Sequence, residues 1–72
     1  MNTVSLSAWN SARAKVVARF PHLSRLDEKN FACNACRLCV PGLNGLDLLT
    51  LAQVAEGATI EVGGEVSPAK KN

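Results

Sequence analysis

Three cysteines, evenly spaced, are the residues of this sequence best suited to chemistry. Cys33, Cys36 and Cys39 lie in the stretch CNACRLC, with two residues between each pair. Thiolate sulfur is a soft ligand that suits zinc, copper(I) and iron–sulfur clusters. A closed zinc site needs four ligands, and His22 is the one histidine that could supply the fourth. One hypothesis is therefore a small zinc, iron–sulfur or redox protein that uses these four side chains.

The hypothesis that we favour gives these cysteines an ordinary structural role. Residues 31–40 are rich in Cys, Ala, Leu and Val, and we expect them to form a strand. Side chains alternate between the two faces of a strand, so Cys36 would lie opposite Cys33 and Cys39. No single metal ion could then bind all three. We expect Cys36 to be buried and unreactive, the other two thiols to be partly exposed, and no cofactor to be bound.

The overall composition limits what the protein can do. A domain of 72 residues buries only about 60% of the surface that its unfolded chain exposes, so it often needs a metal or a partner. The formal net charge of +2 is too small to predict a nucleic-acid partner. No apolar run approaches the roughly 18 residues of a membrane span, and the first residues lack a signal-peptide pattern. We expect a cytoplasmic protein with no membrane partner.

No pattern in the sequence predicts an enzyme. There are no paired carboxylates, no glycine-rich phosphate loop and no nucleophile beside a base. The odd number of cysteines also argues against a closed disulfide framework. We therefore expect a binding protein rather than a catalyst.

The first half of the chain predicts a strand and then a helix. Apolar and polar residues alternate over residues 2–9, which is typical of a half-buried strand. Asn10-Ser11 then offers an N-cap, and residues 12–20 place apolar side chains at helical spacing. Pro21 should end this helix, because the residue before a proline avoids the helical region.

The second half predicts another helix and a last strand. Asn44 can cap a helix over residues 45–52, with Leu46 and Leu49 in its buried stripe. Residues 58–62 alternate again as a strand. Together the elements predict an α+β domain over residues 2–66, a small open-faced sandwich in which two short helices cover one face of an antiparallel sheet. We expect residues 67–72 to be a disordered tail.

Two stretches of the second half resemble a known family. Residues 40–52, VPGLNGLDLLTLA, resemble the segment of HPr, the histidine-containing phosphocarrier of the sugar phosphotransferase system, in which a strand ending in V-N-G leads into a short helix ending in L-L-T-L-A. Residues 56–62, EGATIEV, are similar to the next strand of that family. Ala12-Arg13 falls where the family has the A-R of its G-L-H-A-R-P motif.

The chain departs from the HPr pattern at its functional positions. Ser11 stands where the family has its phosphorylated histidine, and Asn44 replaces the regulatory serine. The C-terminal helix of the family has no counterpart in residues 67–72. The resemblance therefore implies a degenerate HPr-like module that has lost the phosphohistidine relay. It also implies that the first helix and the helix after Asn44 form a docking surface for a protein.

The candidate binding residues follow from this resemblance and from helix chemistry. Ser11 could accept a phosphate at a helix N-terminus with help from Arg13, although an N-cap serine and an exposed arginine are the ordinary roles. Asn44, Leu46 and Leu49 belong to the second implied docking helix. We expect the partner to be another protein or a second copy of the chain.

Overall fold

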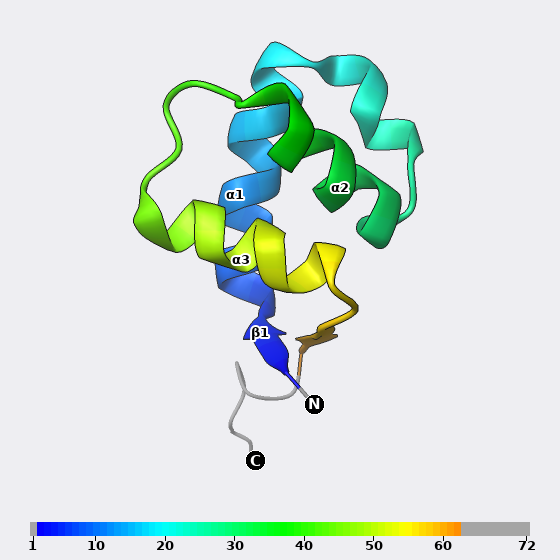
Figure 1. Cartoon of the computed structure of the whole chain (residues 1–72), viewed down its shortest axis with the longest axis vertical. Helices are drawn as coiled ribbons and strands as arrows, with labels where there is room; N and C mark the ends of the chain where they lie inside the picture. The colour runs from blue at the N-terminus through cyan, green and yellow to red at the C-terminus, as the bar shows by residue number, and fades with distance from the viewer. Residues whose placement is uncertain (1, 63–72) are drawn as a thin grey trace.

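Three α-helices and one short 3₁₀-helix account for most of the residues that the structure describes, which are residues 2–62. The structure is a computed structural model (Figure 1). In chain order its elements are β1 (Thr3–Ser5), α1 (Leu6–Arg19), the 3₁₀-helix η1 (Pro21–Arg25), α2 (Glu28–Leu38), α3 (Gly45–Ala55) and β2 (Thr59–Glu61).

The first helix begins earlier than expected because Ser5 caps it. The Ser5 hydroxyl accepts a hydrogen bond from the Ala8 backbone N–H at 3.1 Å. This bond satisfies one of the N–H groups that lack a partner in the first turn of a helix. The strand predicted over residues 2–9 is therefore wrong beyond Thr3–Ser5. The predicted N-cap at Asn10-Ser11 is also wrong, because both residues lie inside α1.

The helix expected over residues 12–20 is confirmed as the later part of α1. Ala12 and Val16, one turn apart, are fully buried. The helix ends at Arg19, and Phe20 leaves the helical region with a φ of −133°. Phe20 precedes a proline, which disfavours helical backbone at that position.

The strand predicted over residues 31–40 is wrong, because this segment belongs mainly to α2. The Asp27 carboxylate accepts a hydrogen bond from the Asn30 backbone N–H at 2.8 Å and caps the helix. The buried side chains of α2 have the spacing of one helical face. They are Phe31, Ala32 and Ala35. A capped start and helical spacing thus outweigh a strand-like composition here.

The helix expected after Asn44 is confirmed, although it continues to Ala55. The Asn44 side chain accepts a hydrogen bond from the Asp47 backbone N–H at 2.8 Å. In return, the Asp47 carboxylate accepts one from the Asn44 backbone N–H at 3.1 Å. This reciprocal arrangement is a capping box, and it defines where α3 begins.

The sheet differs from the prediction in both size and direction. β1 and β2 pair in parallel, with Thr3 opposite Thr59 and Ser5 opposite Glu61. The predicted α+β open-faced sandwich with an antiparallel sheet is wrong, since within residues 2–62 these two strands form the only sheet. Two predicted strands became mostly helix, so no broad sheet face remains for helices to cover. The end of the expected domain and the predicted tail at 67–72 lie outside the described residues.

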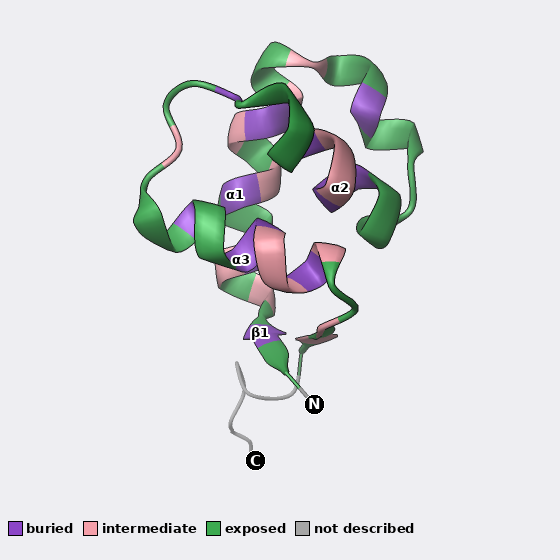
Figure 2. Ribbon diagram, viewed as in Figure 1, coloured by how far each residue is buried: buried purple, intermediate pink, exposed green. Residues whose placement is uncertain are grey.

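The core lies where the three helices meet. α3 packs against both α1 and α2, and Figure 2 shows buried segments on each of them. Trp9 of α1 and Phe31 of α2 meet edge to face, with ring centroids 5.6 Å apart. The buried apolar residues are Val4, Trp9, Ala12, Val16, Leu23, Phe31, Ala32, Ala35, Val40, Leu51 and Val54.

Candidate functional site

Helix α3 buries two polar side chains and exposes three of its four leucines. Asp47 and Thr50 are only 2% and 3% exposed. Leu46, Leu48 and Leu49 are 61%, 50% and 55% exposed, and we call these three residues the leucine face. A single exposed leucine is common in proteins and needs no explanation. Three of them within one turn are unusual, because the same helix buries Asp47 and Thr50 together with the apolar Leu51 and Val54.

The leucine face occupies one continuous side of α3. At about 100° per residue, Leu49 lies about 60° around the helix from Leu46 and about 100° from Leu48. The next turn continues the same side with Ala52 and Gln53, which are half-buried. Figure 2 shows the N-terminal part of α3 mostly in the colour of exposed residues. The leucines therefore lie together on a surface that neither α1 nor α2 covers.

An ion pair sets which side of α3 faces the core. The Lys15 ammonium of α1 donates a hydrogen bond to the Asp47 carboxylate at 2.6 Å. This bond, together with the bond from the Asn44 backbone N–H, holds the pKa of Asp47 below its usual value despite burial. The capping box and the ion pair thus point Asp47 inward. The leucines on the opposite side must then point outward.

The expected buried stripe of α3 is wrong at Leu46 and Leu49, which were predicted to pack inward. Val54, the other residue that helical spacing places in that stripe, is buried, together with Asp47, Thr50 and Leu51. Apolar residues surround most of α3, so helical periodicity alone could not choose between its two sides. The N-x-x-D spacing of Asn44 and Asp47 is a sequence signal for the start of the helix, but it does not show which side of the helix faces the core.

Ser11 and Arg13 do not form the expected anion site. Ser11 is exposed on α1 well beyond the first turn, so the unpaired N–H groups of a helix start are not beside it. The Arg13 guanidinium lies 5.4 Å from the centroid of the Phe31 ring and donates a hydrogen bond to the Ser24 carbonyl at 3.2 Å. Arg13 thus joins α1 to α2 and η1, a structural role.

The cysteines lie on or just after α2 rather than on a strand. Cys33 and Cys36 are three residues apart on the helix, so strand alternation does not separate them. Cys33 is half-buried, and its thiol donates a long hydrogen bond to the Ala55 carbonyl, with 3.8 Å between sulfur and oxygen. Cys36 is exposed, and the expectation that it is the buried thiol of the three is wrong. Cys39, also exposed, follows the end of the helix.

The surroundings of these cysteines favour neither a reactive thiolate at Cys36 nor a metal site. Partial burial, and then the neighbouring Cys33, raise the pKa of Cys36, which lowers the thiolate fraction at neutral pH. His22 is exposed on η1, and its ring meets that of Phe20 edge to face. Within residues 2–62, no three His, Cys, Asp or Glu side chains converge in a way that could hold a metal ion.

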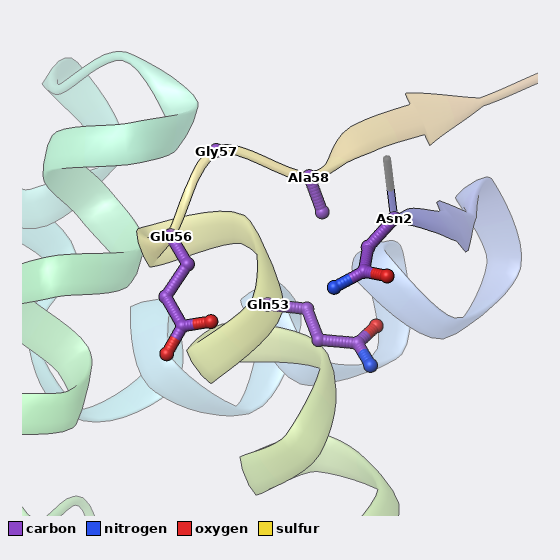
Figure 3. A pocket seen from close by; sticks show the side chains of 5 residues that line it. All are labelled: Asn2, Gln53, Glu56, Gly57 and Ala58. Carbon is purple, nitrogen blue, oxygen red and sulfur yellow. The ribbon is translucent and has the colours of Figure 1, made fainter.

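Two open depressions lie elsewhere on the described surface. One, of about 310 Å³, is lined by Asn2, Gln53, Glu56, Gly57 and Ala58. Figure 3 shows the Asn2 and Gln53 amides extending below Ala58, with the Glu56 carboxylate apart from them. The other, of about 480 Å³, is lined by Leu6, Trp9, Asn10, Arg13, Glu28, Ile60 and Val62. Neither depression places a nucleophile beside a base, so the leucine face is the stronger candidate site.

None of the helices in residues 2–62 is both long and apolar enough to span a membrane. Comparison of the chain with protein-family models, with curated proteins and with solved structures finds no match.

Proposed function

We propose that the chain is a non-enzymatic protein-binding module of the cytoplasm, and that the leucine face of α3 is its docking surface. The observation that carries this proposal is the exposure of the leucine face: Leu46 and Leu49 are more than half exposed, although the same helix buries Asp47 and Thr50. Apolar side chains gathered on one surface are typical of sites that bind other proteins. A partner would remove this surface from water.

The energy available at this face is enough for a binding centre. Fully burying one leucine contributes about 1.5–3 kcal/mol relative to leaving it exposed. Three leucines that are roughly half exposed could therefore contribute about 2–5 kcal/mol when a partner covers them. Association itself costs free energy, so the face would act as the centre of a larger contact.

The HPr-like pattern in residues 40–62 supports the same surface. It implies that the helix after Asn44 contacts a partner protein, and α3 is that helix. Leu46 and Leu49 are two of the residues to which the resemblance points. We propose an HPr-like docking role without the phosphohistidine relay, because Ser11 stands at the relay position.

Site-specific photo-crosslinking tests the proposal. A benzoylphenylalanine introduced at Leu49 should form one dominant adduct with a protein in cells, and mass spectrometry would identify it. The matched control is the same group at Leu26, which is 38% exposed between η1 and α2. Figure 1 shows this connection at the opposite edge of the molecule from the start of α3.

Titration with the purified adduct partner then measures the contact. Leu49→Lys should weaken its binding by at least about tenfold, as expected when a central apolar contact is lost, and Leu26→Lys should leave it unchanged. Equal adducts from both positions, or no adduct from Leu49, would contradict the proposal.

A further inference from the structure

We infer that the larger of the two depressions binds a small zwitterionic ligand, an α-amino acid with an apolar side chain. This depression has a volume of about 480 Å³ and is lined by Trp9, Arg13 and Glu28 among others, and we call it the Trp9 depression. No residue of α3 lines it, so it is separate from the leucine face and the inference goes beyond the docking role proposed above.

Three segments that are far apart in the sequence line the Trp9 depression. α1 contributes four residues at positions i, i+3, i+4 and i+7, a spacing that places them on one side of the helix. They are Leu6, Trp9, Asn10 and Arg13. Ile60 of β2 and Val62 just after it add aliphatic side chains, and Glu28 is the first residue of α2. The fold thus gathers an apolar wall and two opposite charges around one hollow.

The apolar part of the Trp9 depression suits an aliphatic side chain. Trp9 is 4% exposed and its ring packs edge to face against Phe31, so it forms a fixed floor. Leu6 and Ile60 are half-buried, and Val62 is 57% exposed. A ligand would remove this apolar surface from water. Hollows of about 300–1,000 Å³ with apolar walls and a few polar groups are typical of small-molecule sites.

Arg13 supplies a carboxylate-binding group that is already held in place. Its guanidinium lies 5.4 Å from the centroid of the Phe31 ring and donates a hydrogen bond to the Ser24 carbonyl at 3.2 Å. A guanidinium has five N–H donors, so others remain for a ligand. Because two contacts already fix this side chain, holding a carboxylate costs it little further conformational entropy.

Glu28 brings the opposite charge to the same hollow. It is exposed, and within residues 2–62 it forms no ion pair with Arg13, although both line the depression. A zwitterion can bridge the two, with its carboxylate at Arg13 and its ammonium group at Glu28. A simple carboxylate would meet Glu28 as a like charge, and a simple amine would meet Arg13 in the same way. The pair of charges therefore favours a ligand that carries both.

Fluorescence of Trp9, the single tryptophan of the chain, tests binding directly. Leucine is the probe, because it combines a zwitterionic head with an aliphatic side chain. We expect a saturable change with a dissociation constant between high micromolar and millimolar, since the depression is open. Alanine, which has the same head and a smaller side chain, should bind about tenfold more weakly. No saturable change at tens of millimolar leucine, in fluorescence or in the NMR signal of the Trp9 indole, would overturn the inference.

Two analogues of leucine test the recognition of its charges. Isocaproate lacks the ammonium group and isoamylamine lacks the carboxylate, whereas both keep the aliphatic chain. Each should bind about fivefold more weakly than leucine, because it loses one ionic contact. If either analogue binds as tightly as leucine, the depression does not recognise a zwitterion and the inference is wrong.

Glu28→Gln tests the same contact from the side of the protein. The substitution removes a charge at an exposed position, and circular dichroism would check that the helices are retained. Leucine should bind this variant about fivefold more weakly than the parent, whereas isocaproate should bind it at least as well. Glu56→Gln is the matched control, since Glu56 is an exposed glutamate that lines the other depression, and it should leave leucine binding unchanged. Equal effects of the two substitutions, or equal losses for leucine and isocaproate, would overturn the inference.

Discussion

The ion pair between Lys15 and Asp47 joins two helices that are far apart in the sequence. Replacing Asp47 with asparagine removes the charge but keeps a side chain of the same shape. The Lys15 ammonium then loses its anionic acceptor, and α3 loses a negative charge in its first turn. We expect Asp47→Asn to lower the free energy of unfolding by about 1–3 kcal/mol, measured by urea denaturation. No measurable loss would show that the pair does not hold α3 in place.

The same carboxylate predicts how stability depends on pH. The pKa of Asp47 is lowered in the folded protein, mainly by its hydrogen bond with Lys15, so the unfolded chain binds the proton more readily. Its contribution is therefore fully present above the unfolded value of about 3.9 and is lost as pH falls through the lower folded value. Urea denaturation of the parent and of Asp47→Asn should be compared across this pH range. The difference between their free energies of unfolding should shrink toward low pH. If the difference in free energy of unfolding stays constant below pH 4, the predicted contribution of the Asp47 carboxylate is wrong.

Ser11 predicts the absence of phosphate transfer. It occupies the position at which the HPr resemblance implies a histidine, and it lies inside α1 rather than at a helix start. We expect no phosphorylation when the chain is incubated with phosphoenolpyruvate and the general phosphotransferase enzyme. An acid-labile phosphate on His22, detected by mass spectrometry, would contradict this expectation.

At the scale of single elements, the start of α1 depends on one serine. Ser5→Ala removes the acceptor for the Ala8 backbone N–H, so we expect a loss of about 0.5–2 kcal/mol in the free energy of unfolding. Ser11→Ala is the matched control. Ser11 is exposed within the same helix, so its replacement should change stability by less than about 0.5 kcal/mol. A larger loss at Ser11 would place the cap where the sequence first suggested it.

The end of α2 offers a stabilising change. Cys39 follows this helix with a φ of 52°, in the left-handed region that favours glycine. Cys39→Gly should therefore raise the free energy of unfolding, by about 0.5–1 kcal/mol, measured by thermal and urea denaturation. A decrease would mean that the Cys39 side chain makes contacts that outweigh its backbone strain.

How well each element could be predicted depends on the range of the interactions that form it. The start of α3 was predictable because its cap lies beside it in the sequence. α2 was missed because its cysteines and alanines resemble a strand, although Asp27 and the spacing of Phe31, Ala32 and Ala35 were available as helical signals. The outward direction of Leu46 and Leu49 depends on Lys15, which is 32 residues from Asp47, and no local pattern shows that contact.

At the scale of the whole molecule, the proposed docking surface links stability to the concentration of its partner. A partner that binds the folded chain and not the unfolded one stabilises the fold by mass action. We expect the midpoint of thermal unfolding to rise as the partner is added. Leu49→Lys should remove most of this rise, and calorimetry at several partner concentrations would measure it. The same midpoint with and without the partner would contradict the docking surface.

The parallel pairing of β1 with β2 has a consequence for synthesis of the chain. Thr3 and Thr59 pair across about 56 residues, so β1 leaves the ribosome long before its partner strand exists. At 5–20 residues per second, that delay is roughly 3–11 s. α1 and α2 are both complete by residue 38 and can form locally in that interval, whereas Val4, which is buried in the finished fold, has no strand beside it. The nascent chain therefore presents an open strand edge until β2 has been made.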